Sequence, residues 1–249
     1  MRFLVFQHIA CEHPAIFRDF LKTDGIAWDA VELDEGEPVP DFAGYDALMV
    51  MGGPMDVWQE AEHPWLVTEK QAIRRWVEAG KPYLGLCLGH QLLAASLGGE
   101  VGPGQKEVGV LDVELTPAGV ADPLFAGLPR RFPALQWHGA EVKRAPQGAA
   151  VLAASPLCAV QALRVGERAW GMQFHVECTA ATVPEWGEIP VYACALEETL
   201  GAGALEGLRS AAAAAMPGFN RAARQIYRNF IAALRNQPLP RERSSEARG

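Results

Sequence analysis

Residues 81–99, KPYLGLCLGHQLLAASLGG, contain two apolar runs joined by a corner that is rich in glycine. The first run, 82–88, predicts a short buried strand, and the second, 90–99, predicts a helix. Gly85 and Gly89 flank Cys87, and glycine permits the backbone angles that a reversal within two or three residues requires. We therefore expect Cys87 at a tight strand-to-helix corner, pushed into the open below a helix N-terminus.

The same alternation of strand and helix covers the first hundred residues. Apolar runs predict strands at 2–9, 27–33, 46–53 and 82–88, and helical spacing predicts helices at 15–25, 64–80 and 90–99. This order indicates an α/β fold with a flavodoxin-like, mainly parallel open sheet and helices on both faces. Ligands bind such sheets beyond the carboxyl ends of the strands, where both Gly52-Gly53 and Cys87 are expected.

The pattern changes beyond residue 100. Short strands predicted at 107–116, 132–142, 149–155, 159–166 and 169–177, with turns at Pro117, Gly127, Gly139 and Gly166, indicate an antiparallel extension. After residue 178 the chain is expected to form C-terminal helices, including one over 219–236, and residues 237–249 are expected to be a frayed tail. Without a repeat or an interior linker, residues 1–249 are interpreted as a single domain.

Composition excludes several classes of protein. The net charge of −8 and the lack of a strongly basic run argue against nucleic acid as the main partner. No run approaches the roughly 20 apolar residues of a membrane span, and residues 1–14 lack a secretory pattern. The five cysteines are irregularly spaced without a CxxC pair, which argues against disulfides or structural zinc and favours the cytoplasm.

Cys87 has the surroundings of a nucleophile, although any one cysteine is more often core filler. The N-terminus of the following helix favours a thiolate, and the same corner presents serine in G-x-S-x-G hydrolases. The backbone N–H groups of Leu88 and of Gly53, which follows another strand, are candidate oxyanion donors.

Among the six histidines, His175 is the best candidate for the base. It is expected to end the strand 169–177, and Glu177, two residues on, shares its face and holds its ring. The alternative is that Cys87 fills the core, His175 is a satisfied strand-end histidine and Glu177 is a surface acid. The combination with two glycine corners favours a Cys87–His175–Glu177 triad. No third ligand accompanies His175 and Glu177, so no metal is expected.

The stretches GLCLGHQ, GGPM, QWHGAEV and FHVE resemble motifs of class I (triad-type) glutamine amidotransferases, and the likeness covers roughly residues 44–180. It is closest to free-standing members similar to the amidotransferase domain of GMP synthetase. It implies that Cys87 forms a γ-glutamyl thioester, that His175 protonates ammonia and then activates water, and that Glu177 orients His175. The family positions implied to hold the oxyanion are Gly53 and Leu88, and those implied to contact glutamine are Gly52, Gln91 and the backbone around Trp137 and His138.

Two positions depart from the family pattern. Val176 stands where the family has proline. Ala140 stands where the family has an acid, and the loss of this carboxylate argues against a strict preference for glutamine. Cys178 is interpreted as a packing residue. The chain lacks a phosphate loop, and no cofactor is expected.

Three functions remain open at the level of sequence. The first is a glutamine amidotransferase or glutaminase with a separate synthase. The second is a γ-glutamyl hydrolase or peptidase that acts on small γ-glutamyl compounds. The third is a non-catalytic redox or stress protein, against which the His175–Glu177 pair argues.

Overall fold

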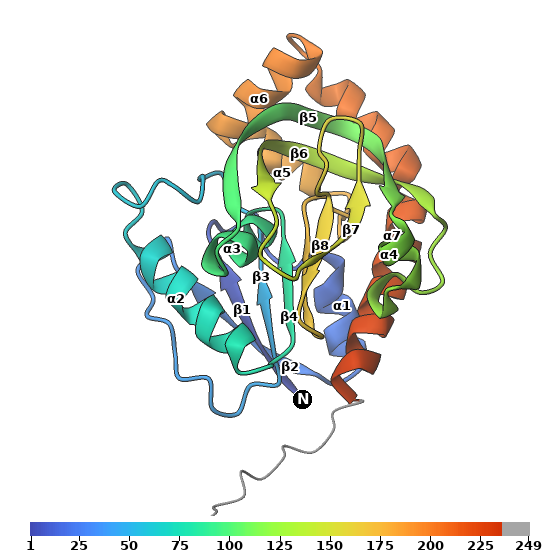
Figure 1. Cartoon of the computed structure of the whole chain (residues 1–249). Coiled ribbons are helices and arrows are strands. Elements are labelled where there is room, and N and C mark those ends of the chain that lie inside the picture. The colour runs from blue at the N-terminus through green and yellow to red at the C-terminus, as the bar shows by residue number, and fades with distance from the viewer. Residues whose placement is uncertain (236–249) are drawn as a thin grey trace, which may run out of the picture.

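A computed structural model describes residues 1–235, and the predicted tail at 237–249 lies outside these residues. One sheet of nine strands, in the order β2-β1-β3-β4-β9-β8-β7-β5-β6, runs through the molecule (Figure 1). Helices flank this sheet, and further helices follow it near the C-terminus. This mixed sheet confirms the predicted α/β class.

Five parallel strands form half of the sheet. They are β1 (Arg2–Gln7), β2 (Ala27–Glu32), β3 (Ala47–Val50), β4 (Tyr83–Leu86) and β9 (Ala169–Met172). Their order is that of a flavodoxin-like sheet, with β9 in the fifth place. β3, β4 and β9 are buried along their whole length, as expected for strands covered on both faces.

Helices cover both faces of the parallel strands. On one face, α1 (Ile16–Thr23) and α7 (Leu205–Arg235) pack against the sheet through residues such as Phe17 and Phe230. On the other, α2 (Trp65–Glu78) and α3 (Leu88–Ser96) pack through residues such as Trp76 and Leu92 (Figure 1). Alternate residues of each strand supply the two cores, because successive side chains point to opposite faces.

The remaining strands are antiparallel. They are β5 (Glu100–Leu115), β6 (Arg131–Arg144), β7 (Ala150–Ala154) and β8 (Ala162–Val165). β9 pairs antiparallel with β8 but parallel with β4, so placing 169–177 in the antiparallel extension was wrong in part. Strand β9 also ends at Met172, five residues earlier than expected.

Two local expectations between residues 115 and 145 were wrong. Gly139 lies within β6, which continues through it, rather than at a turn. Pro117 opens the short helix α4 (Pro117–Ala121), which Thr116 caps by accepting a hydrogen bond from the Gly119 N–H. A 3₁₀ turn, η1 (Pro123–Phe125), follows at once.

The C-terminal helices close one end of the long β5–β6 hairpin. Helices α5 (Thr182–Gly187) and α6 (Pro190–Leu200) share a core with Trp137 of β6 and Phe219 of α7. α7 begins at Leu205, so it takes in the alanine run at 210–216 as well as the helix predicted from 219. Within residues 1–235, no helix has the length and apolar character needed to cross a membrane.

Candidate active site

Cys87 occupies a strained corner between β4 and α3. Its φ of 51° and ψ of −103° make it one of two non-glycine residues with positive φ among residues 1–235. Such conformations cost about 1–3 kcal/mol and persist where the surrounding packing enforces them. The strand and helix on either side therefore hold the Cys87 backbone in this conformation.

Packing explains the two glycines around Cys87. A Cβ on Gly89 would lie 2.2 Å from the carbonyl oxygen of Val50, and one on Gly85 would lie 2.5 Å from the carbonyl oxygen of Gly89. The Tyr83 hydroxyl donates a 2.7 Å hydrogen bond to the Gly89 carbonyl oxygen. The start of α3 thus lies against β3 and β4 at a distance that only glycine allows.

The expectation that Cys87 is pushed into the open was wrong. The residue is only 7% exposed. It lies instead in the lining of a cavity of about 600 Å³, together with Leu88, Gln91 and Gly53. α6 and β6 form other walls of this cavity, although both elements lie far from Cys87 in the sequence.

His175 lies beyond the end of β9 rather than on it. Its backbone pairs with Leu135 of β6 through two hydrogen bonds of 2.9 Å. Its Nδ1 lies 2.5 Å from Oε1 of Glu177, and the backbone N–H of Val176 donates to the other oxygen of Glu177 at 3.0 Å. Val176 therefore supplies a backbone donor that proline, the usual residue of the family here, does not have.

The electrostatics of His175 are dominated by its partners. Burial lowers the pKa of His175, but the Glu177 charge and interactions with the Cys87 thiol outweigh burial and raise this pKa well above its ordinary value. The opposite ring nitrogen, Nε2, has no well-aligned hydrogen-bond partner among residues 1–235. Cys87, His175 and Glu177 are therefore brought together, with one ring nitrogen still available.

Gln173 is a site residue that sequence reasoning missed. Its Nε2 donates to the Cys87 Sγ at 3.4 Å, and its Oε1 accepts a 3.0 Å hydrogen bond from Nε2 of Gln91. Gln91 also donates a longer bond of 3.4 Å to the carbonyl oxygen of Ala140. The sequence feature that could have indicated Gln173 is its position two residues before His175.

The loop after β3 meets the start of α3. A Cβ on Gly53 would lie 3.1 Å from the Leu88 side chain, so the two predicted oxyanion residues are neighbours. As the first residue of α3, Leu88 has a backbone N–H without an acceptor inside its own helix. Gly52 is fixed through its carbonyl oxygen, to which Nδ1 of His8 donates at 2.8 Å.

A buried polar cluster supports this loop, and sequence reasoning missed it too. Nε2 of His8 lies 2.9 Å from Glu69 on α2, and both side chains are fully buried. The neighbouring Glu12 carboxyl lies against Gly52, where a Cβ would approach it to 2.6 Å. His8 follows β1 directly, so its place at the carboxyl end of a parallel strand was the available signal.

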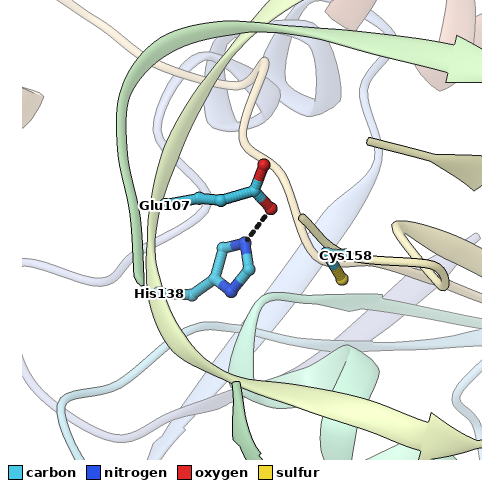
Figure 2. Close-up of side chains that lie close together, drawn as sticks. All are labelled: Glu107, His138 and Cys158. Atoms are coloured by element: carbon cyan, nitrogen blue, oxygen red, sulfur yellow. Dashed lines mark ion pairs between the residues drawn. The ribbon is translucent and has the colours of Figure 1, made fainter. Parts of the chain in front are cut away.

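Trp137 and His138 line the cavity from β6. Nε1 of Trp137 donates to the carbonyl oxygen of Tyr192 at 3.0 Å, which ties β6 to α6. The His138 ring pairs with Glu107, its Nε2 lying 3.2 Å from the carboxylate (Figure 2). Ala140 also lines the cavity, so the missing acid leaves an apolar position in this wall.

Comparison with known proteins places this geometry in a family. The family model for class-I glutamine amidotransferases matches residues 20–184, more than half of the chain. The chain is 39% identical over 150 residues to GMP synthase (glutamine-hydrolyzing) of Aeropyrum pernix, covering 59% of this chain and 27% of that protein. It is 37% identical over 142 residues to a protein of Ignicoccus hospitalis that is named as one subunit of GMP synthase (glutamine-hydrolyzing), covering 56% and 71%.

Solved structures agree with the sequence comparison. A glutamine amidotransferase from Thermotoga maritima superposes with a TM-score of 0.83 at 27% identity, covering 93% of this chain and 98% of that one. One from Methylobacillus flagellatus has a TM-score of 0.82 at 29% identity, covering 95% and 96%. The chain spans about a quarter of the length of the curated relatives it matches first. This chain belongs to the class-I glutamine amidotransferase family.

Proposed function

We propose that the protein hydrolyses the side-chain amide of glutamine to glutamate and ammonia. The observation that carries the proposal is the buried His175–Glu177 pair beside Cys87, with Nε2 of His175 lacking a well-aligned hydrogen-bond partner among residues 1–235. This is the arrangement of nucleophile, base and orienting group that covalent amide hydrolysis needs. Membership of the class-I family supports the same activity.

The proposed reaction proceeds through a thioester. The Cys87 thiolate attacks the amide carbon, and the N–H groups of Leu88 and Gly53 hold the resulting oxyanion. The carbon–nitrogen bond then breaks as His175 gives its Nε2 proton to the leaving ammonia. Water attacks the thioester next and loses a proton to His175, and the carbon–sulfur bond then breaks, which releases glutamate and restores the Cys87 thiolate.

Electrostatics support these roles. Because Glu177 and Cys87 help to raise the pKa of His175, the ring is stabilised in its charged form next to the sulfur. The hydrogen bond to Glu177 occupies Nδ1, so Nε2 is the nitrogen that exchanges protons. Gln173 donates to the sulfur and thereby stabilises negative charge on it.

We place the amino-acid end of the substrate against α3 and β6. Gly52, Gln91 and the backbone of Trp137 and His138 are the proposed contacts. Gln91 bonds to Gln173 and to the Ala140 carbonyl oxygen, which aligns α3 with β6 at the thiol. In this arrangement Gln91 also holds Gln173, whose amide donates to the sulfur that attacks the substrate.

The cavity favours a second candidate, γ-glutamyl amides of apolar amines. Its volume of about 600 Å³ is within the roughly 300–1,000 Å³ range of sites for drug-sized ligands. Beyond Cys87 its lining is largely apolar and includes Met55, Trp58 and Val191. A leaving amine larger than ammonia would lie against these side chains.

We also propose the setting in which the protein works. Some relatives are named as a single subunit of GMP synthase, so a separate synthase subunit is the proposed recipient of ammonia in the first function. All five cysteines are free thiols, which supports the predicted cytoplasmic location.

One assay separates the two substrate classes. The protein is incubated with glutamine, with a γ-glutamyl anilide and with γ-glutamyl dipeptides, and free glutamate, ammonia and amine are followed. Glutamate release from any of them should vanish in Cys87→Ala and His175→Ala and persist in Cys11→Ser. Turnover that survives Cys87→Ala contradicts the proposed triad.

The Trp58→Ala variant distinguishes the candidates further. For the second candidate, it should lower kcat/KM for the anilide and leave that for glutamine nearly unchanged. Equal effects on both substrates contradict an apolar amine site at Trp58. Ammonia release from glutamine that requires an added synthase supports the first candidate.

A further inference from the structure

Three buried side chains from two strands and a loop lie together beside the cavity. They are Glu107 on β5, His138 on β6 and Cys158 in the loop between β7 and β8 (Figure 2). One carboxylate oxygen, one ring nitrogen and the sulfur all lie within 4.8 Å of one another. We propose that they form a binding site for a divalent transition metal, with zinc as the best fit. The inference does not depend on the proposed amide hydrolysis.

The His138 ring is oriented as a ligand. Its Nδ1 lies 3.0 Å from the carbonyl oxygen of Ala140, and a carbonyl only accepts, so Nδ1 carries the proton. Metal-binding histidines are commonly held by such a bond from the other ring nitrogen. The remaining nitrogen, Nε2, is buried without a well-aligned hydrogen bond among residues 1–235 and faces Glu107.

The Glu107 carboxylate is held in place by two donors. Ser155 Oγ donates to one oxygen at 2.7 Å, and Nε2 of Gln161 donates to the other at 2.7 Å. The oxygen next to His138 is therefore held in position by Gln161, as hydrogen-bond partners hold the carboxylates of metal sites.

The spacing suits one tetrahedral ion. The His138 Nε2 and the Glu107 oxygen are 3.2 Å apart. Two ligand atoms that each lie about 2.0–2.1 Å from one zinc ion, at the tetrahedral angle, are about 3.3 Å apart. The sulfur lies within 4.8 Å of both atoms and would approach to about 3.6 Å from each on binding zinc.

The charges and the coordination number also fit. A thiolate and a carboxylate neutralise a divalent cation, so a buried site of this composition carries no net charge. Sulfur, nitrogen and carboxylate ligands together are typical of zinc. His138 lines the cavity, from which a water molecule supplies the fourth ligand.

Without metal the same side chains satisfy one another differently. Cys158 is a free thiol, and Glu107 pairs with the ring of His138. Metal binding replaces the thiol proton and any proton on Nε2, both of which leave to solvent. The three residues are widely separated along the chain, which is why no metal motif is visible in the sequence.

Cobalt(II) is the probe that tests the site. The whole protein is stripped with a chelator and titrated with Co²⁺, and thiolate-to-cobalt charge transfer is followed in the near ultraviolet with the tetrahedral bands in the visible. One equivalent should bind per chain, and Zn²⁺ should displace it. The absence of a thiolate band overturns the proposal.

Matched variants identify the thiol. Cys158→Ser should lose the charge-transfer band and weaken Zn²⁺ binding at least about tenfold in competition with a chromophoric chelator. Cys87→Ser must retain the band, because Cys87 and His175 are the alternative ligands. Loss in Cys87→Ser with retention in Cys158→Ser overturns the proposal.

A more conservative variant tests the same site if Cys158→Ser does not fold. Glu107→Gln keeps the size of the side chain and removes its charge, so it should weaken Zn²⁺ binding while the thiolate band persists at saturating Co²⁺. Unchanged Zn²⁺ affinity in Glu107→Gln contradicts the proposed ligand set. Circular dichroism establishes that each variant is folded.

Discussion

The Tyr192 hydroxyl on α6 donates a 2.6 Å hydrogen bond to the buried carboxyl group of Glu12, which lies in the loop after β1. This bond joins a wall of the cavity to the loop that carries Gly52, because the second oxygen of Glu12 lies against that glycine. Burial raises the pKa of Glu12, and the nearby His175 charge lowers it without reversing the shift. Glu12 therefore couples α6, the glycine loop and the proposed base.

We predict that Glu12→Gln lowers the pKa of His175. The substitution keeps an acceptor for Tyr192 and removes negative charge near the ring, so the charged imidazole loses stabilisation. Nitrogen chemical shifts of the His175 ring, measured against pH, check this. Tyr192→Phe keeps the carboxyl group but removes a hydrogen bond that lowers the Glu12 pKa, so it should shift the His175 pKa in the same direction by less. An equal shift in the two variants would point to packing rather than to the lost charge.

Glu177→Gln should abolish most of the proposed activity while the protein stays folded. The amide removes the charge that raises the pKa of His175 and disturbs the choice of ring tautomer. A loss of roughly 10²–10⁴-fold in kcat is expected for a mispositioned base. Steady-state release of glutamate measures it, and Glu197→Gln on the exposed side of α6 should be silent. Near-normal turnover of Glu177→Gln would refute its role as the orienting residue.

Gly89→Ala should destabilise the whole fold by about 3 kcal/mol or more. The added Cβ would lie 2.2 Å from the Val50 carbonyl oxygen, so the backbone rather than a flexible side chain would have to shift. Gly207 on α7 is the matched control, because nothing lies within 4 Å of a Cβ there, and Gly207→Ala should be neutral or stabilising by up to about 1 kcal/mol. Urea denaturation gives both values, and similar midpoints for the two variants would contradict the packing argument.

Acid should destabilise the protein through His90. This ring is fully buried against the carbonyl oxygen of Val160, and burial lowers its pKa to about 4. In the unfolded chain the His90 ring takes up a proton near pH 6.5, and in the folded chain it does so only near pH 4. The contribution of this group to the free energy of unfolding is therefore fully present above pH 6.5 and is lost as the pH falls toward 4. The loss from this group is about 3 kcal/mol.

Urea denaturation at several pH values between 7 and 4 measures the effect of His90. His90→Gln keeps a donor for the Val160 carbonyl oxygen and does not titrate. Its stability should therefore fall less over this range than that of the wild type. Parallel pH profiles for the two proteins would show that other groups cause the acid sensitivity.

The parallel half of the sheet was predicted well from the sequence. Short apolar runs with glycine at or just beyond their end, such as 46–53 and 82–88, form buried parallel strands when amphipathic helices flank them. The direction of β9 was not predictable in the same way, because a four-residue strand carries no mark of its partners. β9 is parallel on one side and antiparallel on the other only because β4 and β8 lie there.

The site was predicted in part, for a related reason. Cys87, His175 and Glu177 were found from corners and spacing, and the structure places them together, although their roles remain proposals. The recess around Cys87 was missed because it depends on α6, which Trp137 and Tyr192 bind to β6 across more than fifty residues. Gln173, His8 and Glu12 were missed since each acts through a contact that its own neighbours in sequence do not reveal.

The close approach of α3 to β3 sets a limit for protein design. Transplanting the five residues Gly85–Gly89 into another sheet would not reproduce the strained cysteine. The host must also bring a strand carbonyl within reach of Gly89, as Val50 does, and a hydroxyl to bind its carbonyl oxygen, as Tyr83 does. The smallest portable unit is thus a pair of adjacent parallel strands with the first turn of the helix that crosses them.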